Sequence, residues 1–109
     1  MNSAWRSSAQ QFLLYNWYRK GQCGISLAAK PGTSNHEGGL AIDTSYYSYW
    51  KPTLEKYGWK WLGSSDVVHF DYVAGGTDLK KQNLKAFQRL WNRHNSWKVR
   101  ALLIWCGCR

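Results

Sequence analysis

Two segments of the sequence hold side chains that could bind a metal ion and move a proton. Residues 34–43 and 66–72 together supply two imidazoles and four carboxylates, from His36, Glu37, Asp43, Asp66, His69 and Asp71. A catalytic zinc ion commonly takes three nitrogen or oxygen ligands from the protein and keeps one position for water. The ion lowers the pKa of that water and polarises a carbonyl, while a nearby carboxylate passes the proton to the leaving amine. These residue types are compatible with metal-dependent amide hydrolysis.

The positions of Asp43, His69 and Asp66 along the chain are consistent with one shared site. Asp43 lies near the end of the apolar run 40–44, so its carboxylate would be costly to bury without a cation beside it. His69 lies in a run of β-forming residues. Asp66 precedes it by three residues and would face the opposite side of a single straight strand. Asp66 can reach the site of His69 only from a preceding turn, which the Gly-Ser-Ser sequence at 63–65 favours.

Three further polar residues have more than one interpretation. Glu37 is either a general base or a solvated or structural residue beside His36, and we favour the second. Asp71 is either a metal ligand or a charge at a strand edge, and we favour the edge charge. His94 lies in a polar segment and is interpreted as a surface residue. Residue types and spacing alone therefore leave the ligand set open.

Local patterns predict an α+β fold that would position these residues. Helical periodicity and end signals predict helices over residues 8–20, 48–57 and 79–92. Apolar and β-forming runs predict strands over residues 40–44, 59–62 and 67–72. The order lacks a regular β-α-β alternation, which favours α+β over a doubly wound sheet. Three tryptophans could fill the core or line a groove, and we favour the core for Trp50, Trp59 and Trp61.

Charge divides the chain into two parts. The full chain of 109 residues has a net charge of +9, yet residues 1–78 balance to +1 and residues 79–109 hold eight Lys and Arg with no acid. We therefore predict a globular core over residues 1–78 and a basic tail over residues 79–109. Such a tail either attracts polyanions or forms a solvated face. No nucleic-acid-binding motif accompanies the charge, so no nucleic-acid partner is expected.

The sequence shows no export or membrane signal. Residues 1–6 lack the basic region and apolar run of a signal peptide. The longest apolar stretch, residues 101–106, is far too short to span a bilayer. We therefore expect no transmembrane segment, and the oligomeric state stays open.

Three short motifs follow one another along residues 3–72. The pattern Ser-x-His-x-x-Gly-x-Ala-x-Asp is met by Ser34, His36, Gly39, Ala41 and Asp43. An acid-x-x-His-Phe-x-Tyr pattern is met by Asp66, His69, Phe70 and Tyr72. An upstream Ser-x-aromatic-Arg is met by Ser3, Trp5 and Arg6. Together these motifs resemble those of the zinc D-alanyl-D-alanine carboxypeptidases of the VanY type and related peptidoglycan endopeptidases. The resemblance implies a small antiparallel sheet with flanking helices that carries a zinc site, as in D,D-peptidases and hedgehog-like proteins.

The resemblance also implies roles for individual residues. His36, Asp43 and His69 would bind Zn²⁺, and Asp66 would act as general base and acid. Arg6 would hold a carbonyl or carboxylate of the substrate and stabilise the oxyanion, a task that suits its planar fork of donors. The remaining role falls to Ser34, which would orient the site or the bound peptide. The implied activity is hydrolysis of peptidoglycan stem peptides at the cell wall, in the extracellular space or periplasm.

Some features depart from the family pattern and leave alternatives. Some members use Glu at the position of Asp66, and Asp resembles the L-alanyl-D-glutamate endopeptidases of phage lysins. The chain begins almost at its arginine motif, so an inactive, truncated wall-binding module is a further alternative. Residues 84–92 resemble the opening helix of a peptidoglycan-binding repeat, whose remaining part is not matched by residues 96–109. The bond that is cut is therefore open between D-Ala–D-Ala and L-Ala–D-Glu.

Overall fold

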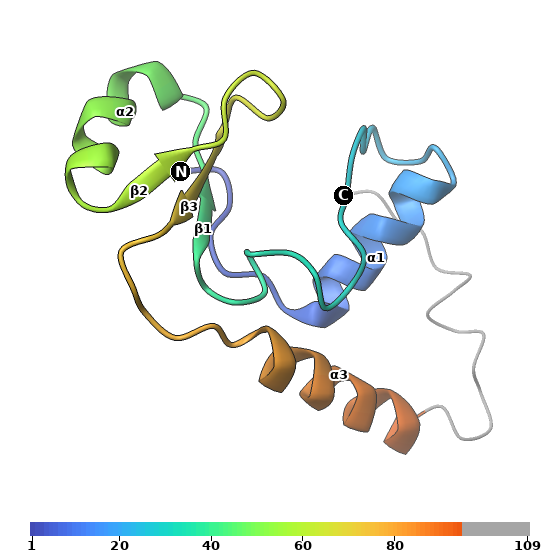
Figure 1. Cartoon of the computed structure of the whole chain (residues 1–109). Coiled ribbons are helices and arrows are strands. Elements are labelled where there is room, and N and C mark those ends of the chain that lie inside the picture. Colours follow the sequence, from blue (N-terminus) through green and yellow to red (C-terminus); the bar gives the residue numbers. More distant parts are fainter. Residues whose placement is uncertain (95–109) are drawn as a thin grey trace.

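A computed structural model describes residues 1–94 as three helices and a three-stranded sheet. In chain order these elements are α1 (Ser8–Arg19), β1 (Ala41–Asp43), α2 (Tyr47–Lys56), β2 (Trp59–Trp61), β3 (His69–Tyr72) and α3 (Lys80–His94). Figure 1 shows the sheet and α2 at one end of the molecule and α1 with α3 at the other. The predicted α+β class with a small antiparallel sheet and flanking helices is confirmed.

The sheet is antiparallel in the order β1-β3-β2, so β3 is its central strand. Asp43 of β1 lies opposite His69 of β3 in the register, two positions from the pair of Ala41 with Asp71. Side chains on directly opposed residues of an antiparallel pair lie on the same face of the sheet. The backbone pairing therefore brings together an acid and an imidazole that are 26 residues apart in sequence.

Helix α1 begins at residue 8, as the sequence predicts, and Ser7 is its N-cap. The backbone N–H of Gln10 donates to the Ser7 hydroxyl at 3.1 Å, and the Ser7 N–H donates to the Gln10 side chain at 2.9 Å. This reciprocal capping box satisfies donors that the first turn of a helix leaves without partners. The helix ends beside Gly21, whose φ of +63° suits glycine.

Helices α1 and α3 pack through aromatic side chains. The ring of Phe12 lies 5.6 Å from the rings of both Phe87 and Trp91, at tilted or edge-on angles. Such angles bring the positive edge of one ring against the negative face of another. Asn83 on α3 adds polar contacts, since its amide donates to the carbonyls of Arg6 and Glu37 at 3.0 Å each. The described part of α3 is thus fixed against the segments that carry the predicted site.

The apolar core of the described chain is very small. Phe70 and Ala41 are the apolar residues that it buries, at 0% and 2% exposed. Polar residues outnumber them among the buried positions: Ser8, Gln11, Ser34, His36, Glu37 and Thr44. Buried polar groups must be hydrogen-bonded to be tolerated. Packing around the predicted site therefore depends on hydrogen-bonded polar contacts as well as on apolar burial.

The preference for core positions is wrong for Trp50, which is 44% exposed. It lies on α2, whose described residues are all at least partly accessible, and it contacts Tyr49 edge-on with ring centroids 5.1 Å apart. Trp59 and Trp61 of β2 are half-buried. Trp61 stacks on Tyr47 at 6.0 Å and fixes its indole N–H on the carbonyl of Val67. The short helix α2 lies beside a narrow sheet, so its aromatic side chains are covered only in part. This explains why Trp50 is more exposed than Trp59 and Trp61.

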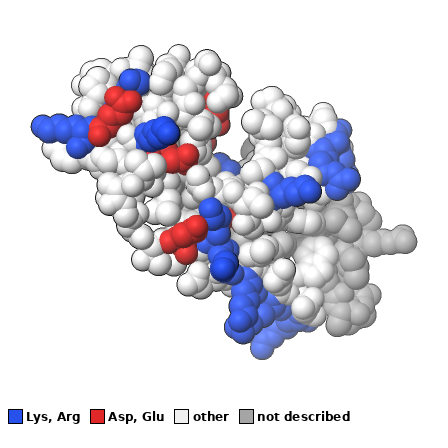
Figure 2. Space-filling model, viewed as in Figure 1, with Lys and Arg blue, Asp and Glu red and all other residues white. Residues whose placement is uncertain are grey.

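Basic side chains line the outer face of α3. Four of them are exposed at steps of four residues: Lys81, Lys85, Arg89 and Arg93. Figure 2 shows this row of cations along the lower edge of the molecule. No helix among the described residues is long and apolar enough to cross a membrane. Residues 95–109 of the predicted tail lie outside the described residues, and the division of the chain at residue 78 stays a prediction.

Candidate metal centre

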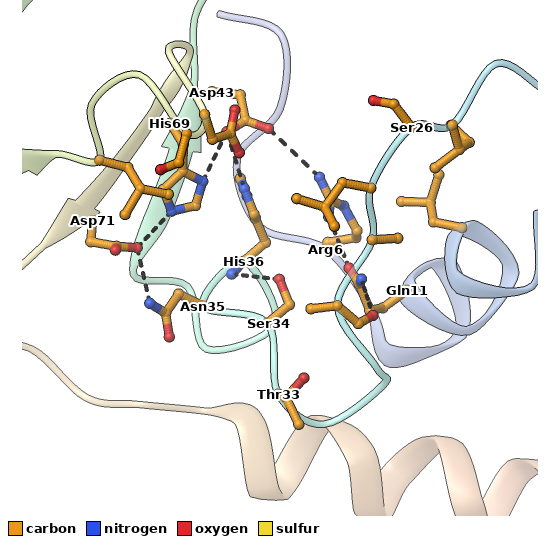
Figure 3. A pocket seen from close by; sticks show the side chains of 18 residues that line it. Arg6, Gln11, Ser26, Thr33, Ser34, Asn35, His36, Asp43, His69 and Asp71 are labelled. Atoms are coloured by element: carbon orange, nitrogen blue, oxygen red, sulfur yellow. Dashed lines mark hydrogen bonds and ion pairs between the residues drawn. The ribbon is translucent and has the colours of Figure 1, made fainter. Parts of the chain in front are cut away.

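The three residues predicted to bind a metal lie together where β1 ends and β3 begins. Oδ1 of Asp43 lies 3.3 Å from Nε2 of His36 and 3.1 Å from Nδ1 of His69. The three potential ligand atoms all lie within 4.8 Å of one another. Figure 3 shows the two imidazoles and the carboxylate pointing toward one another. The structure thus brings together a group of two nitrogens and one oxygen that could hold a metal ion.

The outer nitrogen of each imidazole has its own acceptor. Nδ1 of His36 lies 2.7 Å from the carbonyl oxygen of Ala4, and Nε2 of His69 lies 2.7 Å from Oδ1 of Asp71. Because both partners can only accept, these outer nitrogens carry the protons. In the neutral rings, the nitrogens that face Asp43 then present lone pairs. Metal-binding histidines almost always donate their second N–H in this way.

The donor set fits a divalent cation for a chemical reason. Two imidazole lone pairs and a carboxylate oxygen facing one another repel unless a positive charge lies between them. Two nitrogens and one oxygen also match the ligand sets that zinc takes in catalytic sites. The residues present therefore fit the metal that the sequence motifs imply.

The charges of the site show how it is balanced without a metal ion. Burial opposes ionisation of Asp43, yet hydrogen bonds from His36 and His69 outweigh it and hold the pKa of Asp43 well below its usual range. The hydrogen bond to Asp43 is the largest effect that raises the pKa of His69 to about 9, with Asp71 adding to it against the cost of burial. A proton on His69 therefore supplies the positive charge that a metal ion would otherwise bring.

Arg6 borders the same site from the segment before α1. Its guanidinium donates to the side-chain oxygen of Gln11 at 2.8 Å and to the hydroxyl of Ser3 at 2.9 Å. One Nη lies 3.9 Å from Oδ2 of Asp43. Burial lowers the pKa of Arg6, while Asp43 and Glu37 act in the opposite direction. An arginine keeps its charge under such shifts, so Arg6 offers a fixed cation with donors facing the cleft.

Glu37 has a structural position, as favoured by the sequence, but it is buried and not solvated. Its carboxylate is 0% exposed and lies away from the cleft. It accepts from the Ser8 hydroxyl at 2.6 Å, from the backbone N–H of Gly32 at 2.8 Å and from that of Ser34 at 3.2 Å. One side chain thereby satisfies the backbone of a loop that has no regular secondary structure.

Ser34 is also buried, and its hydroxyl accepts from the backbone N–H of His36 at 3.3 Å. This hydrogen bond therefore lies within the loop that carries the imidazole of His36. Ser34 also borders the cleft. The position of Ser34 is compatible with both predicted roles, which are orienting the site and orienting the bound peptide.

Asp66 lies in the turn that the sequence predicts for it. Its N–H donates to the carbonyl of Gly63 at 3.2 Å, and its own carbonyl accepts from the N–H of His69 at 3.1 Å. This turn places the half-buried Asp66 among the residues that line the cleft with His36, Asp43 and His69. The geometry is compatible with its predicted role as the residue that moves a proton, which stays a prediction.

The cleft has a volume of about 590 Å³. The metal-binding group, Arg6 and Asp66 line one part of it, and the segment 25–29 lines another. Figure 3 shows Ser26 of this segment across the cleft from Asp43. Ligand pockets commonly have volumes of 300 to about 1,000 Å³, so the space suits a short peptide or similar small ligand.

Three polar residues of this region escaped the sequence analysis or were misread there. Gln11 is almost fully buried, where it accepts from Arg6 and donates to the carbonyl of Ala29 at 2.7 Å. A glutamine in a helix carries no signal that would reveal such a role. The preferred interpretation of Asp71 as an edge charge is wrong, because β3 is the central strand and Asp71 faces His69. Asn35, which donates to Asp71 at 2.9 Å, was not singled out.

Comparison with known proteins identifies one family. The family model described as VanY: D-alanyl-D-alanine carboxypeptidase matches residues 1–96. That range holds all three motifs and the candidate metal centre. No curated protein and no solved structure matches the chain.

Proposed function

We propose that this chain, which belongs to the D-alanyl-D-alanine carboxypeptidase (VanY) family, is a zinc-dependent peptidase that hydrolyses peptidoglycan stem peptides. The observation that carries the proposal is the convergence of His36, Asp43 and His69, each imidazole with its outer nitrogen already bonded to an acceptor. A cluster that served only the fold would not need the inner nitrogens of two imidazoles to converge on one carboxylate oxygen.

His36, Asp43 and His69 would hold the ion. Zinc supplies a water molecule of lowered pKa and a Lewis acid for a carbonyl. In this chain the three side chains come from a loop and two paired strands, and the pairing of these strands supports their convergence. The outer contacts of the imidazoles with Ala4 and Asp71 keep the metal-binding nitrogens aimed inward.

Asp66 would take a proton from the attacking water and give it to the departing amine. The support for this role is position: its half-buried carboxylate borders the cleft beside the metal ligands. Arg6 would bind a carbonyl or carboxylate of the peptide. It is held by Gln11 and Ser3, so a substrate would meet donors that are already oriented.

A matched pair of histidine variants tests the metal centre. We expect the wild-type protein to bind about one zinc ion and to release amino acids or peptides from purified muropeptides. His36→Ala should lose both the metal and the activity. His94→Ala removes an exposed histidine on α3 and should change neither. A folded wild-type protein that takes up no zinc would refute the proposal.

A second variant separates the proton-transfer role from metal binding. Asp66→Asn keeps the size of the side chain but removes its basicity, so we expect zinc content to be retained while kcat falls by at least about 100-fold. Hydrolysis of a synthetic stem peptide, followed by mass spectrometry, measures this loss. Wild-type kcat in the Asp66→Asn variant would assign the proton transfer to another group.

The same assay decides which bond is cut. We favour the terminal D-Ala–D-Ala bond, as in the matched family. Aspartate at position 66 resembles the L-alanyl-D-glutamate endopeptidases, which makes the bond between L-Ala and D-Glu the alternative. Release of free D-alanine supports the first activity. A product with L-alanine at its carboxyl end supports the second. Binding without any cleavage would indicate an inactive wall-binding module.

The site of action follows from the substrate. Stem peptides of peptidoglycan are in the cell wall, so we propose that the protein acts there, outside the cytoplasmic membrane. Peptidoglycan peptides are its proposed partners.

A further inference from the structure

We propose that Asp71, Asn35 and Lys80 form an outer support that fixes which nitrogen of His69 faces the metal. This inference rests on the metal centre of the proposed function. Three contacts connect the residues in a line from α3 to the site. Nζ of Lys80 donates to Oδ1 of Asn35 at 2.9 Å, Nδ2 of Asn35 donates to Oδ1 of Asp71 at 2.9 Å, and Nε2 of His69 lies 2.7 Å from the same oxygen.

Each contact in this line has only one possible direction. A lysine ammonium only donates, so the oxygen of the Asn35 amide must face it. The amide nitrogen then faces Asp71, whose carboxylate only accepts. Nε2 of His69 must in turn carry a proton to reach that carboxylate. Nδ1 is left facing Oδ1 of Asp43 at 3.1 Å, as the metal-binding nitrogen.

Asp71 reaches His69 because of the strand geometry. The two residues lie two positions apart on β3, so their side chains point to the same face of the sheet. Asp71 is 23% and His69 is 12% exposed at the side chain, which limits competition from water for the bond between them. A carboxylate at this position both orients the ring and increases its basicity.

Lys80 differs from its neighbour Lys81 in a way that provides a control. Lys80 is partly buried at the start of α3, where it contacts Asn35 and forms an ion pair with Asp78 at 3.3 Å. Lys81 is exposed and extends from the helix toward solvent. Figure 3 shows Asn35 and Asp71 below His69, on the side of the site that faces α3. Removing one lysine therefore changes the line of contacts, while removing the other changes only net charge.

The test measures zinc affinity by competition with a chromophoric chelator. We expect Asp71→Ala to weaken zinc binding by about 10- to 100-fold. Asp71→Asn, whose amide can donate to Nε2 as well as accept, should fall between Asp71→Ala and the wild type. Lys80→Met should weaken binding measurably, and Lys81→Met should leave it unchanged. Near-ultraviolet circular dichroism shows whether each variant is folded.

A spectroscopic measurement separates orientation from general loss of structure. Long-range ¹H–¹⁵N spectra report which ring nitrogen carries a proton. In metal-free protein at a pH where the ring of His69 is neutral, we expect the Nε2–H tautomer in the wild type and a mixture in Asp71→Ala. Asp71→Ala with wild-type affinity and an unchanged tautomer would overturn the inference. Failure of the wild type to bind zinc would refute the proposed function instead, and the tautomer would still decide this inference.

Discussion

The two sides of the metal centre are built by different forces. The sheet wall, residues 41–43 and 69–72, holds Asp43 and His69 on paired strands with the fully buried Phe70 behind them. The loop wall, residues 32–38, holds His36 without a strand or helix. Its backbone instead converges on the buried carboxylate of Glu37. A different kind of side chain thus holds each wall: the buried ring of Phe70 in the sheet wall and the buried carboxylate of Glu37 in the loop wall.

The difference shows how a small protein can fix a ligand in irregular backbone. In the sheet wall, strand pairing satisfies the backbone N–H and C=O groups, and apolar burial stabilises the arrangement. In the loop wall, one side chain accepts from the donors that no strand satisfies. The sheet wall therefore tolerates changes that keep volume, and the loop wall tolerates changes that keep the acceptor oxygens.

The largest effect is expected from removing the apolar anchor of the sheet wall. Phe70→Ala leaves a cavity beside His69 and should lower the free energy of unfolding by about 3–5 kcal/mol. Urea denaturation of the zinc-bound protein measures the loss. Tyr49→Ala, at a position 74% exposed on α2, is the matched aromatic control and should change the stability by less than about 0.5 kcal/mol. Equal losses in both variants would show that Phe70 is not an anchor.

A somewhat smaller loss is expected from removing the acceptor of the loop wall. Glu37→Ala leaves the N–H groups of Gly32 and Ser34 and the Ser8 hydroxyl without their acceptor, which should cost about 3 kcal/mol. Zinc affinity should fall with it, because His36 depends on this loop. Glu37→Gln keeps one acceptor oxygen and should lose less.

The control for this change is an exposed glutamate on α2. Glu55 forms an ion pair with Lys51 at 3.0 Å and is about 44% exposed at the side chain. Exposed pairs of this kind contribute roughly 0–1 kcal/mol, so Glu55→Ala should have little effect. A Glu37→Ala variant as stable as Glu55→Ala would mean that the loop wall is held by other contacts.

The smallest expected effect is the change in apparent zinc affinity per pH unit, and it depends on His69 in the sheet wall. The folded, metal-free protein holds a proton on His69 up to a pKa of about 9, and zinc must displace it. Apparent zinc affinity should therefore rise by about tenfold per pH unit, or about 1.4 kcal/mol, below that pKa and level off above it. Chelator competition across this range measures the slope. Affinity that does not change with pH would contradict the protonated state of His69.

Local patterns in the sequence were sufficient to predict the helices and strands, whereas the group of His36, Asp43 and His69 was predicted from the resemblance to a known family. Ser7 and Gly21 are end signals that operate within a few residues, so α1 has the predicted start and end within one residue. The turn at Asp66 was predicted because strand geometry allowed no other route to the site. Such inferences succeed because the deciding contacts are close in sequence.

The residues that were missed or misread depend on contacts between distant segments. Gln11 bonds Ala29, and Asn35 bonds Asp71, across 18 and 36 residues. The role of Asp71 depends on β3 being the central strand. The order of the strands in a sheet cannot be read from the residue pattern of each strand alone. Trp50 was placed in the core, although helical periodicity does not show how much of a short helix its neighbours cover.

The very small apolar core has a consequence for the supply of metal. A ligand that binds only the folded state stabilises it by mass action, by about 2.7 kcal/mol when its free concentration is 100 times Kd. With only Phe70 and Ala41 fully buried among the described apolar residues, such a gain is a large part of what a domain of this size can have. Free zinc would then set the population that resists proteolysis, so that the lifetime of the protein would follow the metal content of its surroundings.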